Sequence, residues 1–239
     1  MNAELQGWVA VLGGFAAGLA ALLKYLSFRS RANRSAAAGD AFARTVDALA
    51  SPDEARRLAG AILLRRFFDR STEQGDKHIP YAKEAVAVIT ALLRGAEGST
   101  FQKLLADGLA HAPDLRHADL QECNLRNAYL GRRFDRQPDM SRADFFQADL
   151  SGASLKGAAA TEAVFFRAKL QGTILREADL RDADFREADL QGASFDGARL
   201  AGARFGGATN VPEHLAALLD GEARVAADGD VRSAVPAPG

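Results

Sequence analysis

The chain of 239 residues contains 30 Lys and Arg against 31 Asp and Glu, and this balance gives a net charge of −1. Such a charge provides no electrostatic argument for a nucleic-acid partner, so we expect the chain not to bind nucleic acid. The single cysteine, Cys123, excludes an intramolecular disulfide framework.

An apolar segment follows the short N-terminal segment 1–6. Residues 7–23 contain no charged side chain, and Lys24 can extend its stem so that the apolar span covers residues 7–27. This length predicts a single transmembrane helix in contact with membrane lipid. A signal peptide is one alternative, against which the absence of positive charge before the segment argues. An alanine-rich helix in a soluble core is the other.

Positive charges come after the apolar segment and continue into a basic linker over residues 28–39. They are Lys24, Arg29, Arg31 and Arg34. By the positive-inside rule, the N-terminus lies outside and the bulk of the chain lies in the cytoplasm.

A stripe of small residues lies within the apolar segment. Ala10, Gly14 and Gly18 are spaced by four residues, a pattern that lets two membrane helices approach closely. The stripe predicts a helix contact in a homodimer. The alternative is that it reflects only the abundance of Gly and Ala in membrane helices.

Residues 40–112 carry the patterns of a helical domain. Ser51 and Glu54 form a capping box with Pro52 at the first helical position, and they predict a helix that runs through Phe68. The apolar stripe expected to be buried on this helix consists of Leu58, Ile62, Leu63 and Phe67.

Two further helices are predicted in the same domain. Pro80 starts the second, and Ser99 caps the third, which extends from Thr100 to about Ala110. The apolar positions of the second are Ala85, Val86, Ile89, Leu92 and Leu93. These stripes are too narrow for isolated helices, so we expect the helices to pack together. The last helix should cover the start of the next domain.

The segment over residues 113–210 repeats every five residues. A large apolar residue recurs at this spacing, and a small residue stands two positions before most of them, as Ala178 stands before Leu180. Five matches neither the period of a helix nor that of a strand, so the chain must turn a corner in each repeat to keep the large residues inside. The pattern therefore predicts a solenoid.

A second period of twenty residues sets the shape of each coil. Phenylalanines occur at 145, 165, 185 and 205, so four repeats make one coil and the coil has four sides. We expect these phenylalanines to form an internal ladder, with Leu125 one coil before Phe145, and leucines at 130, 150, 170 and 190 to form another. Glycines such as Gly152 and Gly172 recur at the turn position, where a strained backbone explains them.

The pattern Ala-(Asp/Asn)-Leu-x-x resembles that of the pentapeptide repeat family. This resemblance implies a mainly β solenoid, a right-handed quadrilateral β-helix of about five coils. The preceding helical domain is similar to the region that joins a membrane anchor to such repeats in bacterial proteins, which implies the bacterial inner membrane as the location. The pattern breaks over residues 131–138, which we interpret as a bulge or small loop. It also breaks at Ala158–Ala160, where alanine replaces the expected leucine and leaves a thinner core.

The end of the chain carries two further features. Residues 211–220 contain one amphipathic pattern, from Pro212 to Leu219, which predicts a helix that caps the Phe205 end of the solenoid. Residues 221–239 are rich in Ala, Asp and Pro and are expected to be disordered.

The sequence predicts binding and not catalysis. It contains no nucleophile–base set and no phosphate-cradling glycine loop, and the four histidines have no metal-ligand spacing, so we expect no catalytic residue, no metal and no cofactor. Phe146 and Phe166 each follow an inward phenylalanine and are twenty residues apart, and Val164 shares their face. These three residues predict a patch that binds an unidentified protein partner, unless the 131–138 segment or the helical domain covers it. The favoured function is a membrane-tethered interaction scaffold.

Two other functions follow from the family resemblance. Some members mimic DNA and bind type II topoisomerases, which requires a strongly acidic rod. Residues 113–208 contain 15 acidic and 14 basic residues, and this balance argues against mimicry. A secreted effector is the other alternative, and the predicted membrane anchor argues against it.

Overall fold

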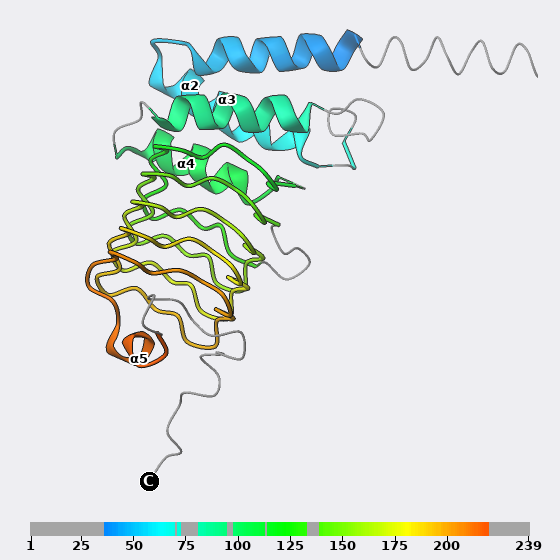
Figure 1. Cartoon of the computed structure of the whole chain (residues 1–239). Coiled ribbons are helices and arrows are strands. Elements are labelled where there is room, and N and C mark those ends of the chain that lie inside the picture. Colours follow the sequence, from blue (N-terminus) through cyan, green and yellow to red (C-terminus); the bar gives the residue numbers. More distant parts are fainter. Residues whose placement is uncertain are drawn as a thin grey trace, which may run out of the picture.

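The computed structural model describes residues 36–69, 71–72, 81–94, 98–112, 114–132 and 139–219. Helices gather at one end, a solenoid extends from them, and a short helix lies at the far end (Figure 1). Within these ranges, none of the helices has the length and apolar character needed to cross a membrane. The predicted transmembrane segment 7–27, with its stripe of Ala10, Gly14 and Gly18, lies outside the described residues.

The helical domain begins with a helix over residues 36–49, followed by α2 (Glu54–Leu64) and the 3₁₀ helix η1 (Arg65–Phe67). The predicted N-cap of α2, Ser51, is wrong by two residues. Asp53 is the N-cap, since its side chain accepts a hydrogen bond from the backbone N–H of Ala55. Its carboxylate lies at the positive end of the helix dipole, where negative charge is favourable.

The predicted buried stripe is correct at Phe67, which is 3% exposed, and Leu58 is half-buried, but the two positions between them are wrong. Ile62 and Leu63 are 53% and 42% exposed, whereas Gly60, Ala61 and Leu64 are buried. The helix packs through small residues: a Cβ at Gly60 would meet side-chain atoms of Ala48 and Leu49 at 3.2 Å. Close approach at Gly60 therefore sets the buried face, and the large side chains beside it turn outward.

The other two predicted helices are present as α3 (Ala82–Arg94) and α4 (Thr100–Leu109). Ser99 caps α4 as predicted, because its side chain accepts a hydrogen bond from the backbone N–H of Gln102. In α3, Ala85, Ile89 and Leu93 are buried as expected. These positions of α3, together with Leu105 and Leu109 of α4, lie in the core that continues into the solenoid.

Each pentapeptide of the solenoid contains one tight turn. In the repeat that begins at Leu150, the backbone N–H of Ala153 donates to the Leu150 carbonyl at 2.9 Å, and Gly152 has φ = +69°. A positive φ at this position is the signature of a type II turn and favours glycine. The same position also holds Asn, Glu, Asp, Arg and Gln residues with positive φ. The turn geometry thus explains the recurring glycines, although the fold does not require glycine in every repeat.

Neighbouring coils pair through isolated parallel bridges and not through extended strands. From Asp139 onward each bridge joins residues twenty apart, as in Asp144↔Val164 and Val164↔Asp184. The predicted four-sided coil is thereby confirmed. Only one residue on each side of a coil forms a bridge to the neighbouring coil, because the chain turns again within the next repeat.

The first coil is longer than the others, and this corrects the predicted ladders. Asn124 pairs with Asp149 and Tyr129 with Ser154, each twenty-five residues apart. Leu125 therefore precedes Leu150 and not Phe145, and Leu130 precedes Leu155. The offset falls to twenty by Asp139, so the five extra residues belong to the segment where the pattern breaks. Residues 133–138 of that segment lie outside the described ranges.

The predicted phenylalanine ladder is present inside the solenoid. Phe145 and Phe165 stack with ring centroids 4.8 Å apart, as do Phe165 and Phe185, and Phe205 continues the ladder 5.0 Å from Phe185. These separations equal the spacing of paired strands, so the rings follow the rise of the coils. All four side chains are buried.

The helices close the first coil by satisfying its backbone. The N–H of Asn124 donates to the Leu93 carbonyl at 3.0 Å, and the side-chain amide of Gln102 donates to the Asn124 carbonyl at 2.7 Å. The N–H of Tyr129 donates to the Asp107 carboxylate at 2.9 Å. As predicted, the last helix covers the first coil, and the end of α3 shares this role.

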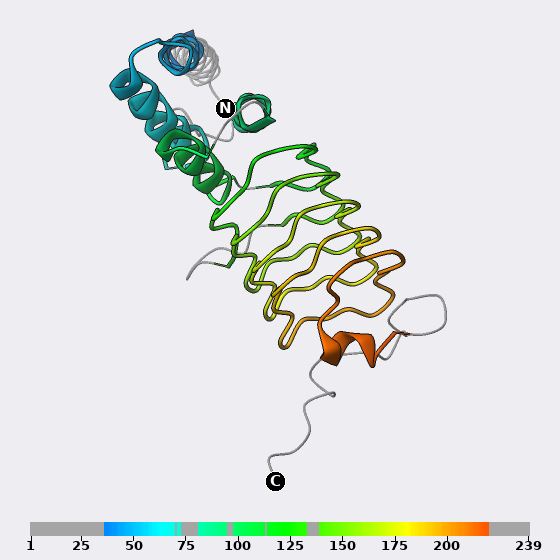
Figure 2. The same ribbon diagram turned by 90° about the vertical axis from the view of Figure 1, so that its left-hand side faces the viewer.

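The far end is closed by a shorter helix than predicted. α5 (Glu213–Ala216) has four residues, because the hydrogen bonds that follow it are of the i→i+3 type, such as the 2.8 Å bond from Leu218 to Leu215. Leu215 is fully buried and Phe205 is only 2% exposed, so the single turn still covers the end of the solenoid. Seen from the side in Figure 2, the coils stack between the helices and α5.

Candidate partner-binding surface

The candidate surface lies at one corner of the solenoid, where the residue after each inward phenylalanine points outward. Phe146 and Phe166 occupy this position in successive coils, and their rings stack with centroids 5.8 Å apart and an angle of 27° between planes. The equivalent residues in the other coils are Gln121, Arg186 and Gly206. The two phenylalanines are therefore a local aromatic substitution in an otherwise polar or small column.

Val164 lies on the adjoining side of the same coil as Phe166. It forms parallel bridges with Asp144 in the preceding coil and Asp184 in the next. Val164, Phe146 and Phe166 are all half-buried. The three predicted residues therefore share one surface, which we name the aromatic corner.

Two arginines flank the aromatic corner. The guanidinium carbon of Arg167 lies 4.9 Å from the centroid of the Phe166 ring, and that of Arg186 lies 5.5 Å from it. Both distances are within the range of cation–π attraction. The solenoid thus partly covers Phe166 with its own cations, while residues 133–138, the other candidate cover, lie outside the described ranges.

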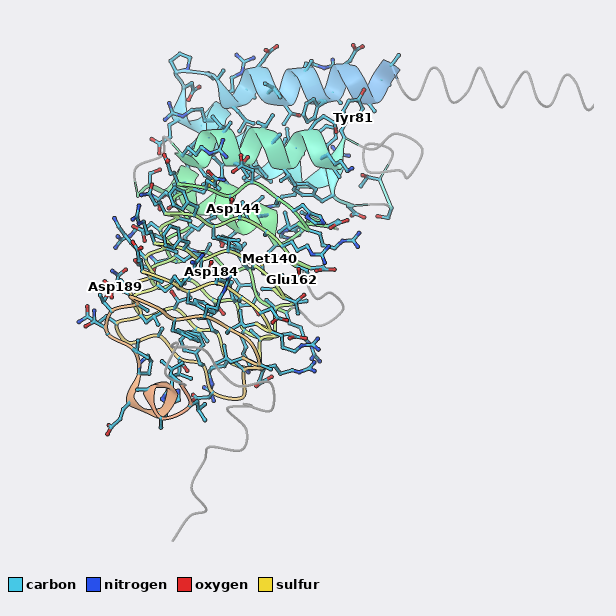
Figure 3. The ribbon with its side chains drawn as sticks, in the orientation of Figure 1. Tyr81, Met140, Asp144, Glu162, Asp184 and Asp189 are labelled. Atoms are coloured by element: carbon cyan, nitrogen blue, oxygen red, sulfur yellow. The ribbon has the colours of Figure 1, made fainter. Side chains whose placement is uncertain are left out.

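Acidic residues frame the aromatic corner along the rod, with Asp144 nearer the helices and Asp184 farther from them (Figure 3). Asp184 is 4% exposed and binds Arg186 at 2.7 Å and Arg204 at 3.2 Å. Burial by itself raises the pKa of Asp184, but the hydrogen bonds from Arg186 and the charges of both arginines outweigh burial and hold this pKa below its ordinary value.

The remaining charges form ladders between coils. Arg142 binds Glu162 at 3.0 Å and Arg167 binds Glu187 at 2.7 Å, each pair joining residues twenty apart. Both partners are about half exposed, so each pair contributes little on its own. The ladders neutralise acidic residues with arginines over the surface, which argues against a continuous acidic face.

Acid should destabilise the solenoid. Asp184 has a folded-state pKa below its ordinary value of 3.8, and that of Asp114 falls to about 2 because Arg116 donates to it. Stability from such groups is complete above the unfolded-state pKa and is lost as pH falls through the folded-state pKa. We expect the thermal unfolding midpoint to fall between about pH 5 and pH 2.

The variant Asp184→Asn isolates this effect. It should be less stable than the parent chain at pH 6, and the difference should shrink as the pH falls through the folded-state pKa of Asp184, where the parent carboxylate becomes protonated. Thermal melts followed by circular dichroism across this range give the comparison. A difference that stays constant with pH would contradict the assignment.

Sequence reasoning missed a second exposed apolar surface. Tyr129 and Ile174 are 37% and 40% exposed, and the bridges Tyr129↔Ser154 and Ser154↔Ile174 place them on one side of the solenoid. Both stand immediately before an inward leucine, at the position that most other repeats fill with a polar residue and that Val164 occupies before Phe165. Reading that position in the sequence could have found them.

No catalytic constellation emerges in the described part of the chain. Cys123 is fully buried, and burial raises the pKa of its thiol to about 12, so the nucleophilic thiolate does not form at neutral pH. Groups of His, Cys, Asp and Glu that could hold a metal ion do not occur among the described residues.

Comparison with known proteins identifies the repeat pattern. Residues 139–176, 163–202 and 178–209 match the model of a family described as pentapeptide repeats (8 copies). Repeats of this kind imply a right-handed quadrilateral β-helix, in agreement with the four-sided coils. No curated protein sequence matches the chain.

Several solved structures are similar to parts of the chain. HetL, a pentapeptide repeat protein involved in heterocyst differentiation regulation in the cyanobacterium Nostoc, is 28% identical over 41% of this chain and 51% of its own, with a TM-score of 0.21. A thylakoid-lumen pentapeptide repeat protein of Arabidopsis thaliana is 24% identical over 59% of this chain and 95% of its own, with a TM-score of 0.30. Rfr23 of the cyanobacterium Cyanothece is 27% identical over 40% of this chain and 62% of its own, with a TM-score of 0.20. The chain therefore spans about half the length of HetL.

Proposed function

Since its repeat domain belongs to the pentapeptide repeat family, we propose that this chain is a non-enzymatic, membrane-tethered scaffold whose solenoid binds a protein partner through the aromatic corner. The observation that carries the proposal is the stacked pair of Phe146 and Phe166 outside the core. Inward phenylalanines are explained by the fold, whereas this outward pair is not.

The chemistry of the aromatic corner supports a protein partner. Half-buried aromatic rings next to arginines are typical of the residues that dominate protein interfaces. The surrounding arginines are engaged by carboxylates in the same solenoid, as Arg167 is by Glu187. A partner that contributes apolar side chains, with acceptors for the arginine edges, would complement this surface.

The membrane part of the proposal rests on the sequence. The uncharged residues 7–23 and the basic residues that follow them favour a single span with the solenoid in the cytoplasm, at the bacterial inner membrane. Contact through Ala10, Gly14 and Gly18 would bring two copies together within the membrane. The tether would hold the solenoid near partners at the membrane surface.

Site-specific crosslinking in cells tests the proposal. A photoreactive phenylalanine analogue in place of Val164 should give a covalent adduct with another protein, recovered in the membrane fraction. The same analogue in place of Ile174, on another side of the solenoid, is the matched control and should give no such adduct. Phe146→Gln/Phe166→Gln should abolish the Val164 adduct, because it removes the aromatic contact.

Glutamine keeps the fold in this test, since the chain itself places Gln121, Gln171 and Gln191 at outward corner positions. An adduct that forms equally from positions 164 and 174, or that survives the double substitution, would overturn the aromatic corner as the binding site. Recovery of the whole chain in the soluble fraction would instead overturn the tether and leave the binding site standing.

A further inference from the structure

A groove of about 280 Å³ lies in the helical domain, away from the aromatic corner. It is lined by Ala41, Arg44 and Thr45 from the helix over residues 36–49, and by Leu63, Arg66 and Phe67 from the end of α2 and from η1. Each set follows the i, i+3, i+4 spacing that places three side chains on one helix face. Each helical segment therefore contributes an apolar wall and one arginine.

The packing of the two helices explains why the groove exists. They meet closely at Gly60, where a Cβ would lie 3.2 Å from Leu49. Farther from this contact, the small side chain of Ala41 leaves space beside Leu63. Phe67 is fixed in the groove by edge-to-face contact with Phe42, with ring centroids 5.1 Å apart. The apolar part of the groove is thus preformed.

The two arginines of the groove differ from those of the solenoid. Arg44 and Arg66 are both exposed, and no ion pair involves either of them within the described part of the chain. The Nε of Arg44 donates to the backbone carbonyl of Asp40 at 3.2 Å. Both guanidinium groups thus remain available to an external anion, and Arg is the side chain best suited to bind phosphate.

The surface beside the groove is also apolar. Leu63, which lines the groove, is 42% exposed, and Ile62, which precedes it in α2, is 53% exposed. An exposed apolar patch with adjacent unpaired cations suits a ligand that is both anionic and hydrophobic. Leu26 and Ala41 are fifteen residues apart, a distance the chain can span over at most about 50 Å, so the groove lies within reach of a bilayer that holds residues 7–27.

We propose that this groove binds an anionic phospholipid. The headgroup phosphate lies between Arg44 and Arg66, and part of an acyl chain lies along Leu63 and Phe67. The inference rests on the proposed membrane location, because that location supplies the lipid. Anionic lipids of the cytoplasmic leaflet also attract the basic residues that precede the groove. Lipid binding would orient the helical domain, and with it the solenoid, on the membrane.

Photolabelling of the full chain tests this site. The chain is placed in neutral detergent micelles that contain phosphatidylglycerol with a photoreactive acyl chain, and labelled peptides are mapped by mass spectrometry. Label is expected on peptides that contain residues 41–45 or 61–67, in addition to the apolar segment 7–27. Unlabelled phosphatidylglycerol should compete for the groove, and phosphatidylcholine should not.

A matched pair of variants makes the test specific. Arg66→Gln and Arg56→Gln each remove one positive charge from an exposed position in the α2–η1 segment, but only Arg66 lines the groove. Arg66→Gln should lower groove labelling about tenfold, as expected for loss of one charge-assisted contact to phosphate. Arg56→Gln should leave groove labelling unchanged, and Arg44→Gln/Arg66→Gln should remove it.

Three outcomes would overturn the proposal. Equal effects of the two single variants would show that charge acts at a distance. Competition by phosphatidylcholine would show that the groove binds acyl chains without selectivity for an anionic headgroup. Equal competition by inorganic phosphate would show that it binds anions without selectivity for lipid. Because labelling is done in micelles, it does not depend on the proposed membrane anchor. If the groove is labelled but the chain fractionates as a soluble protein, the lipid site is retained and the proposed membrane location is overturned.

Discussion

Replacing Phe165 by alanine should lower the free energy of unfolding by about 3–5 kcal/mol, the range found for buried aromatic residues. Phe165 is fully buried and stacks on Phe145 and Phe185, with ring centroids 4.8 Å away on each side. Truncation opens a gap in the middle of the ladder, and the coils cannot close it because hydrogen bonds to both neighbouring coils fix their spacing. The bond from Phe165 N–H to the Asp184 carbonyl is 2.7 Å long.

Phe166→Ala is the matched control in the adjacent residue. Phe166 is half-buried, so the variant loses the stack on Phe146 and the arginine contacts, which together amount to about 1 kcal/mol. Urea unfolding of the full chain, followed by circular dichroism, measures both variants. Equal losses, or a larger loss for Phe166→Ala, would contradict the inward and outward assignment of this pair. A further consequence is that Phe166→Ala should impair the partner adduct while Phe165→Leu should not.

The repeat shows how far periodicity alone can specify a fold. A period of five fixes which side chains point inward, and a period of twenty fixes four sides, so Phe145, Phe165 and Phe185 could be stacked from the sequence. Periodicity does not specify where an insertion falls. The pairing of Asn124 with Asp149 shows that the first coil is five residues longer, and it moves Leu125 out of the phenylalanine ladder.

The aromatic corner was predictable for the same reason as the ladder. Once the inward positions are known, any large apolar residue directly after them lies outside the core at a corner, as the half-buried Phe146 and Phe166 do. The partial cover of Phe166 by Arg167 and Arg186 was not predictable, because it depends on the rotamers of long side chains in two coils. The buried aspartate Asp184 and its two arginines arise from the same inter-coil geometry.

The groove in the helical domain was beyond sequence reasoning. Its residues come from two helices, and its width depends on where Gly60 allows the helices to touch. The sequence pattern favoured the largest apolar side chains of α2 as its buried stripe. Packing instead selected Gly60, Ala61 and Leu64, since close helix contact is favourable at small residues and leaves the bulkier neighbours at the surface.

Leu64→Ala should therefore lower the free energy of unfolding by about 2–5 kcal/mol. Leu64 is fully buried in the core that α2 shares with α4, and the backbone around it is held by Gly60 on one side and η1 on the other. The helix over residues 36–49 cannot move closer to α2 to fill the space, because Ala48 and Leu49 already lie against Gly60. The α4 helix also closes the first coil, so the solenoid should unfold at a lower denaturant concentration as well.

Leu63→Ala removes the same atoms from the next residue and provides the control. Leu63 is 42% exposed, and its truncation should change the free energy of unfolding by less than about 1 kcal/mol. The two variants therefore distinguish the observed register of α2 from the one that the apolar pattern favours, in which Leu63 would be the costly position. A larger loss for Leu63→Ala would contradict the observed orientation of α2. It would also contradict the lipid groove, since a buried Leu63 could not form an apolar wall for a lipid chain. A measured loss for Leu64→Ala that exceeds the loss for Leu63→Ala would support both the packing of the helical domain and the apolar wall of the lipid site.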